Sequence, residues 1–262
     1  MKKLLITILM ISPAFAFAQD AEKPAKTKMM YSVHEDQVKP SMYMEYEKIC
    51  KELVSLMKEH NIEDGGWLTT STDDYRYWYL SPKSSMADLD KNVFKTLTEK
   101  IGKDKMNDLW ARMDKCYDKH GSFMITMDTE LTYMPSGIDQ NPEGETWREF
   151  HFWHFTPENE EAAWKVAKEI TTLVASVKSP LNYRVYRSGF GTVGTYYLVA
   201  FAAKDEADFA AKFAKHRELG GQNLLTKLNE LRALTDKYEE VEGQVRNDLS
   251  YKPQTKVSAT RK

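Results

Sequence analysis

Hydrophobic and polar positions follow two regular patterns in the second half of the chain. Residues 149–155 are almost continuously aromatic or apolar, as in a strand that is buried on both faces. From Thr156-Pro157, a typical helix start, Ala, Val and Ile recur at helical spacing as far as Val177. The remaining predicted elements are strands over 183–187 and 195–202, helices over 206–216 and 224–238, and a closing strand over 245–251.

This order of elements is β-α-β-β-α-β, the ferredoxin-like arrangement, in which helices cover one face of an antiparallel sheet. Alternation places His151 and Trp153 on one face of the first strand and Phe150 and Phe152 on the other. A sheet with bulky side chains on both faces needs a second partner on the face away from its helices.

The first half of the chain repeats the second. Residues 46–57 match residues 163–174 at an offset of 117, and the same offset relates His34 to His151. Residues 130–135 match residues 248–253 at an offset of 118. We therefore predict an α+β protein of two tandem ferredoxin-like units whose antiparallel sheets pack face to face. The predicted segments are a first unit over 29–135, a linker over 136–145 and a second unit over 146–253.

The two ends of the chain are predicted to lie outside these units. Lys2 and Lys3 precede a short apolar run, and Ala16-Phe17-Ala18 offers the small residues of a signal peptidase site. We expect a signal peptide over 1–18, hence export to the periplasm or the medium, with no membrane-spanning segment in the mature chain. Flexible segments are predicted over 19–28 and 254–262.

The charge and composition of the chain indicate which kinds of molecule it is expected to bind. The chain has 37 Lys and Arg against 39 Asp and Glu, a net charge of −2 at pH 7, and no basic block. Nucleic acid is not expected as a partner, because binding to phosphates requires clustered Lys and Arg. A small organic molecule is the expected partner, and the composition leaves the oligomeric state open.

The order of elements, the duplication and the two-faced aromatic strands resemble the dimeric α/β-barrel superfamily. That superfamily includes antibiotic-biosynthesis-monooxygenase-type domains and haem-binding chlorite-dismutase-like proteins. The resemblance implies two units packed sheet to sheet around a pocket, here within one chain. It also implies that haem could be a cofactor, although the sequence carries no motif that requires one.

Two equivalent histidines are the candidate catalytic residues. On the face assignment favoured here, His34 and His151 point into the space between the sheets, where each could act as a general base or hold a metal or haem. The alternative is a half-buried structural histidine retained by duplication. No metal site is predicted, since no His/Asp/Glu cluster shows ligand spacing. We expect His60, His120 and His216 to be solvated at helix ends or on polar faces.

Aromatic and basic residues of the inner strands could line the same pocket. An aromatic set could stack on a flat molecule, or simply form the core between the sheets. An inner-strand arginine could bind a carboxylate, or lie at an exposed edge. These candidate ligand-binding residues are Tyr75, Tyr77, Tyr79, Trp153, Tyr183, Tyr197, Arg76 and Arg184.

Cys50 and Cys116 are the two cysteines of the chain, and both fall on apolar faces of predicted helices. An exported protein could join them in a disulfide, although Ala167 stands at the position equivalent to Cys50 and indicates a need for a small buried residue.

Three functions are consistent with these patterns. The first is a small-molecule-binding protein with a pocket between the sheets, extending to a cofactor-free oxygenase- or isomerase-like enzyme. The second is a non-catalytic structural or protein-interaction module of the cell envelope, which a tightly packed space between the sheets would favour. The third is a haem-binding protein.

Overall fold

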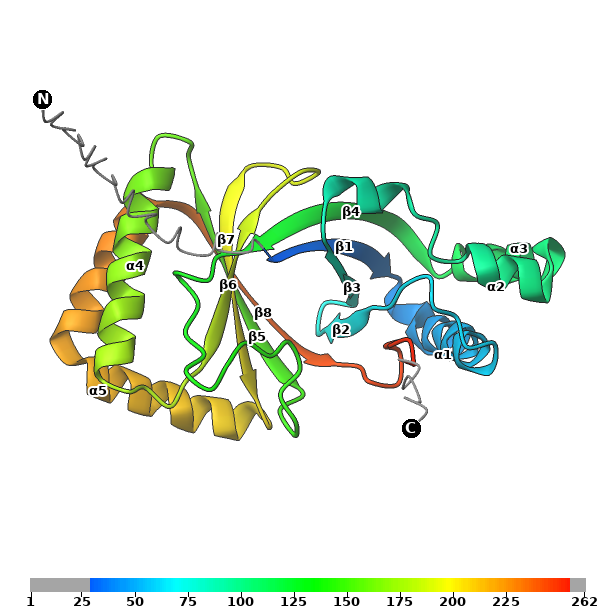
Figure 1. Ribbon diagram of the computed structural model, residues 1–262. Coiled ribbons are helices and arrows are strands. Elements are labelled where there is room, and N and C mark those ends of the chain that lie inside the picture. The colour runs from blue at the N-terminus through cyan, green and yellow to red at the C-terminus, as the bar shows by residue number, and fades with distance from the viewer. Residues whose placement is uncertain (1–28, 255–262) are drawn as a thin grey trace, which may run out of the picture.

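The computed structural model describes residues 29–254, which form one closed eight-stranded barrel flanked by helices on two opposite sides (Figure 1). The signal peptide, the leader and most of the basic tail that the sequence predicts lie outside these residues. The elements of the first half are β1 (Met29–Val38), η1 (Pro40–Met42), α1 (Tyr43–Glu59), β2 (Leu68–Thr72), β3 (Arg76–Lys83), η2 (Met86–Asp90), α2 (Lys95–Ile101), α3 (Lys103–Met113) and β4 (Tyr117–Met127). The elements of the second half are β5 (Trp147–Phe155), α4 (Glu160–Ser176), β6 (Tyr183–Ser188), β7 (Thr195–Ala203), α5 (Glu206–Leu234) and β8 (Thr235–Val245).

The predicted fold class is confirmed. Each half contributes a four-stranded antiparallel sheet, and the strand order around the barrel is β1-β3-β2-β8-β5-β7-β6-β4. The two sheets face one another across the interior, and they also pair edge to edge through β2 with β8 and β4 with β6. Each of these edge pairs spans three residues on each strand, and together they close the barrel.

The pairing register is the same in both halves. His34 of β1 lies opposite Tyr79 and Ser122, and His151 of β5 lies opposite Val199 and Glu240. Positions that the sequence repeat equates therefore occupy equivalent places in the two sheets, which allows the halves to be compared residue by residue.

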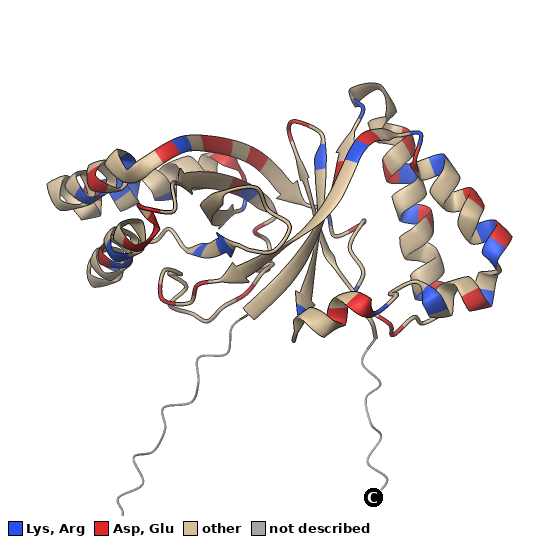
Figure 2. Ribbon diagram, turned by 90° about the horizontal axis from the view of Figure 1, so that it is seen from above, with Lys and Arg blue, Asp and Glu red and all other residues tan. Residues whose placement is uncertain are grey.

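The aromatic strands fill three cores rather than one. Side chains of both sheets meet inside the barrel, including Trp78, Phe150 and Tyr186. The outer faces of the two sheets are covered separately, one by α1 to α3 and the other by α4 and α5. Basic and acidic residues are interspersed along these helices (Figure 2).

The predicted direction of His34 and His151 is wrong. Trp153, which shares a face with His151, packs in the core beneath α4 and α5, whereas Phe150 is in the barrel interior. His34 is on the face of β1 opposite to Tyr31 and Val33, which fill the interior. Both faces of each sheet are buried. Alternation along a strand therefore assigns residues to one face or the other, but it does not indicate which face is covered by helices.

The end of the second unit also differs from the prediction. Helix α5 ends at Leu234 and β8 follows at once, so Tyr238 is in a strand and residues 246–251 lie after the closing strand. The charged run after Leu234 resembles a solvated helix face. In the structure Val241 packs inside the barrel and Val245 is buried, while Glu242 between them is exposed. The predicted break at Gly220-Gly221 is present as a kink, with Gly221 at φ 54°.

Segment 139–147 is held by a buried arginine. Arg148 is 2% exposed, and its guanidinium donates to the carbonyl oxygens of Gln140 (3.1 Å), Glu145 (2.6 Å) and Trp147 (2.8 Å). Burial, and secondarily the charge of Arg184, lowers the pKa of Arg148 to about 9. Arg184, a predicted anion ligand, instead donates to the carbonyl oxygen of Asp139 at 2.7 Å from inside the barrel.

Replacing Gly243 by Ala is expected to destabilise the closure of the barrel. An added Cβ would lie 2.5 Å from the carbonyl oxygen of Ser71, in the β2–β8 pair that joins the halves. We expect the free energy of unfolding, measured by urea denaturation, to fall by about 3 kcal/mol. Gly121→Ala is the matched control, because nothing lies within 4 Å of its added Cβ. Equal stability of the two variants would contradict this prediction and would show that β2 and β8 can move apart to accommodate the added Cβ.

Candidate functional site

Two large cavities lie beneath the helices, on opposite outer faces of the barrel. The C-terminal pocket has a volume of about 580 Å³ and lies between strands β5 to β7 and helices α4 and α5. The N-terminal pocket, of about 450 Å³, lies between the first sheet and helices α1 and α3. The cavity inside the barrel measures only about 60 Å³. Both larger volumes fall in the range of small-molecule sites.

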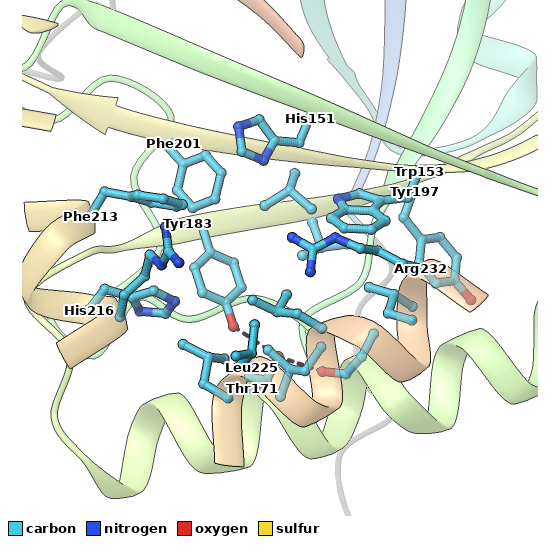
Figure 3. Close-up of a pocket in the computed structure, with 18 of the residues that line it drawn as sticks. His151, Trp153, Thr171, Tyr183, Tyr197, Phe201, Phe213, His216, Leu225 and Arg232 are labelled. Atoms are coloured by element: carbon cyan, nitrogen blue, oxygen red, sulfur yellow. Dashed lines mark hydrogen bonds between the residues drawn. The ribbon is translucent and has the colours of Figure 1, made fainter. Parts of the chain in front are cut away.

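Figure 3 shows the C-terminal pocket, whose walls are mainly aromatic and aliphatic. Trp153, Tyr183 and Tyr197 of the predicted ligand-binding set line it, and so does His151. The structure adds residues of α5 that the sequence analysis did not propose, among them Phe213 and His216. Leu225 and Arg232, also of α5, complete the side of the pocket away from the sheet.

Tyr183 provides a neutral hydroxyl within the C-terminal pocket. Its hydroxyl oxygen lies 3.1 Å from Oγ1 of Thr171, and burial raises its pKa to about 12. Near neutral pH the phenol therefore keeps its proton. The Thr171 hydroxyl donates to the backbone carbonyl oxygens of Leu131 and Ala167, so Tyr183 donates its proton to Oγ1 of Thr171.

His216 is buried rather than solvated, contrary to the prediction. It is 8% exposed, and its Nδ1 lies 2.9 Å from Oγ of Ser179. Among the described residues none forms a hydrogen bond to its Nε2. Burial lowers the pKa of His216, so the imidazole is neutral near pH 7. Donation from Nδ1 to Ser179 would leave the lone pair on Nε2, the form required of a base.

His151 belongs to a hydrogen-bonded chain at the edge of the C-terminal pocket. Its Nδ1 lies 3.0 Å from the hydroxyl oxygen of Tyr238, which in turn donates to Oε1 of Glu240 at 2.5 Å. Its Nε2 lies 3.3 Å from Oε1 of Glu149. Both ring nitrogens thus have protein partners, which suits an orienting role better than direct proton abstraction.

Tyr183 should make stability fall steeply at alkaline pH. Its pKa is about 12 in the folded protein against 10.0 ordinarily, so between these values the folded state holds a proton that the unfolded state has lost. Stability present below pH 10 is therefore lost as the pH rises to 12. We expect the free energy of unfolding to decline more steeply in the native protein than in Tyr183→Phe, by about 1 kcal/mol per pH unit. Urea denaturation of both proteins across this range measures the difference, and parallel curves would contradict it.

The N-terminal pocket has a different chemistry at its mouth. His34 Nε2 lies 3.1 Å from Oδ1 of Asp36, and His120 Nδ1 lies 3.9 Å from the same oxygen. Asp36 is buried, and its Oδ2 accepts a hydrogen bond from Tyr46 at 2.5 Å. His120, predicted to be solvated at a helix end or on a polar face, is exposed and lies on strand β4 directly opposite Asp36. The local sequence feature that could have indicated this polar cluster is His34-x-Asp36, because residues two apart on a strand share one face.

The other predicted residues of the first half do not join the C-terminal pocket. Tyr79 lines the N-terminal pocket, and Tyr77 is buried with its hydroxyl donating to Glu47 at 2.9 Å. Tyr75 is in the turn before β3 at φ 63°. Arg76 pairs with Asp74 and lies 5.1 Å from the ring centre of Trp78. The predicted single aromatic pocket is therefore wrong. Its aromatic members are divided between the two outer faces of the barrel, apart from Tyr75, which is in a turn.

Cys50 and Cys116 are both free and buried, so the disulfide considered from the sequence is not formed in the structure. Burial raises the pKa of the Cys50 thiol to about 12, which keeps it protonated and unreactive.

Comparison with known proteins identifies the architecture. No protein-family model and no curated protein sequence matches the chain. Among solved structures, an anthrone oxidase-like protein aligns with a TM-score of 0.57 at 12% identity over 90% of this chain and 98% of its own. A candidate monooxygenase from Fusobacterium nucleatum aligns with a TM-score of 0.54 at 15% identity over 84% and 93%.

A chlorite dismutase mutant from Candidatus Nitrospira defluvii aligns with a TM-score of 0.50 at 11% identity, over 84% of this chain and 92% of its own. At such identities the similarity concerns the fold alone. Within residues 29–254 none of the helices is long and apolar enough to cross a membrane. The chain has the dimeric α/β-barrel fold, built here from the two tandem halves of one polypeptide.

Proposed function

We propose that the protein binds a flat, mainly apolar organic molecule in the C-terminal pocket and oxidises it in an oxygenase-like reaction. The observation that carries the proposal is the position of His216. A buried imidazole with a free Nε2 lines a 580 Å³ pocket whose other walls are mainly aliphatic and aromatic. Aromatic walls suit a planar ligand, and a neutral imidazole can accept a proton from it.

The chemistry requires an acidic C–H group and dioxygen. His216 takes the proton, and Arg232 is the nearby cation that stabilises the resulting anion. Dioxygen accepts the electrons of that anion. For anthrone, one molecule and one O₂ give one anthraquinone and one water, so the balance needs no further reductant.

Anthrone is the probe suggested by the anthrone oxidase-like structural neighbour. Trp153 lines the pocket, so ligand binding should quench tryptophan fluorescence during titration with anthraquinone. Oxidation is followed by the absorbance of anthraquinone in air-saturated buffer. The proposal predicts saturable binding together with turnover above the spontaneous rate, and it fails if neither is observed.

Haem is a second candidate for the same pocket, because the donor set is compatible with it. His216 Nε2 could ligate the iron, while Arg217 and Arg232 of α5 line the pocket and could pair with the propionates. A bound haem would supply oxygen or peroxide chemistry. Addition of haemin tests this: a shifted Soret band in the native protein, lost in His216→Ala, would support haem binding, and an unshifted band would exclude it.

The structural-module alternative has one observation in its favour. The space between the sheets holds only about 60 Å³, the close packing expected of that alternative. The two larger pockets lie elsewhere, beneath the helices, and they support a ligand-binding role instead.

Export is part of the proposal. Cleavage after Ala18 would make Gln19 the first residue of the mature protein. Intact mass and N-terminal sequencing of protein recovered from the periplasm or medium should give this start, and a chain that retains Met1 in the cytoplasm would contradict it.

A further inference from the structure

The mouth of the N-terminal pocket carries a cluster that the proposed oxidation does not use. We propose that His34, Asp36 and His120 bind a divalent first-row transition metal ion, with open coordination positions facing the pocket. The three potential ligand atoms lie within 4.8 Å of one another. All three residues line the 450 Å³ N-terminal pocket, which leaves room for water or a small ligand beside the ion.

Strand pairing creates this cluster. His34 and Asp36 share one face of β1, and the β1–β4 register places His120 directly opposite Asp36. Asp36 Oδ1 lies between the two imidazoles, 3.1 Å from His34 Nε2 and 3.9 Å from His120 Nδ1. With metal–ligand bonds of about 2.1 Å, small side-chain rotations would bring these atoms to one ion.

The charge of Asp36 supplies a second argument. Its side chain is 3% exposed, and within residues 29–254 it forms no ion pair with lysine or arginine. Burying a carboxylate without a cationic partner is costly, so a bound cation would compensate for its charge. The two histidines are the residues that approach Oδ1, and as metal ligands they need not be protonated.

The surrounding residues hold the ligands as the outer shell of a metal site does. Oδ2 of Asp36 accepts from Tyr46, whose hydroxyl oxygen lies 2.6 Å from that of Tyr79. His34 Nδ1 lies 2.9 Å from Oγ of Ser122, which fixes the ring and leaves Nε2 for the metal. Such partners orient ligands and raise metal affinity.

Two imidazoles and one carboxylate form the ligand set typical of non-haem Fe(II) sites, and Zn(II) and Co(II) accept the same donors. The second half of the chain lacks the set. There the positions of His34, Asp36 and His120 are occupied by His151, Trp153 and Tyr238 in the same register. The duplicated halves have thus diverged, one toward metal ligands and the other toward aromatic pocket walls.

Co(II) and Zn(II) titrations of the purified chain, without a histidine tag, test the proposal. Calorimetry should show a single strong site at neutral pH, and bound Co(II) should give visible absorption bands that added Zn(II) removes. Asp36→Asn and the exposed His120→Ala should each weaken Zn(II) binding at least about 100-fold. Tyr46→Phe, which keeps every ligand, should weaken it about 10-fold.

His151→Ala is the matched control, because it removes the equivalent histidine of the other half and should leave Zn(II) affinity unchanged. Circular dichroism establishes that each variant is folded. Absence of a strong site in the native chain, or affinity that survives Asp36→Asn and His120→Ala in folded protein, would overturn the proposal. Oxidation of anthrone in metal-free protein is a separate measurement, so either proposal can fail without the other.

Discussion

Replacing His216 by Gln is expected to slow oxidation of anthrone at least about 100-fold, the usual contribution of a positioned base. Gln retains a polar side chain that can still reach Ser179, so the pocket should keep its shape. It cannot accept the proton, because an amide is not a base near neutral pH. The affinity for anthraquinone should change little, which places the defect in the reaction rather than in binding.

His60→Gln is the matched control for this experiment, since His60 caps the end of α1 and lines neither large pocket. It should retain the native rate. The pH profile offers an independent measure: the native rate should fall at acid pH as His216 is protonated, and burial displaces this fall below the pH of an ordinary histidine. A rate in His216→Gln equal to that of His60→Gln would contradict the base role.

Replacing Ala167 by Phe is expected to weaken anthraquinone binding more than about 30-fold. Ala167 is on the face of α4 that lines the C-terminal pocket, so an aromatic ring there occupies the volume the ligand needs. Loss of about 2 kcal/mol of binding free energy corresponds to this factor. Fluorescence titration measures it directly.

Ala175→Phe is the control on the same helix, because Ala175 is exposed and does not line the pocket. It should bind as the native protein does, with a similar far-ultraviolet circular dichroism spectrum. If both variants bind equally well, the ligand does not occupy the space beneath α4.

The sequence was sufficient for the order of elements and the duplication, because both depend on local periodicity and on matched spacing. The same repeat predicted that His34 and His151 are equivalent, and the pairing register agrees. It could not tell which face of each sheet the helices cover. Phe150 and Trp153 are both large and apolar, and only the closed barrel decides which of them turns inward.

The polar sites could not be predicted from the sequence, because they are formed by contacts between segments that are far apart in the chain. Asp36 and His120 are separated by 84 positions and meet through strand register alone, which alternation within one strand does not reveal. His216 was predicted to be solvated at a helix end or on a polar face, but α5 continues past it to Leu234 and its side chain is buried beside Ser179. Arg184 was predicted either to bind an anion or to lie at an exposed strand edge, whereas it is buried and donates to the carbonyl oxygen of Asp139.

The two halves show how duplication can yield different chemistry on one scaffold. The strand framework is retained, and so is one histidine at the same place in each sheet. Substitutions at two facing strand positions, Asp36 to Trp153 and His120 to Tyr238 in the alignment of the halves, change a polar cluster into an aromatic wall. No rearrangement of the backbone order is needed for this change.

A crystal structure of the protein with anthraquinone tests most directly whether the ligand site lies beneath α4 and α5. We expect a planar molecule in the C-terminal pocket, in contact with Tyr183 and His216. A ligand found inside the barrel, or a C-terminal pocket that stays empty at concentrations that saturate binding in solution, would contradict it.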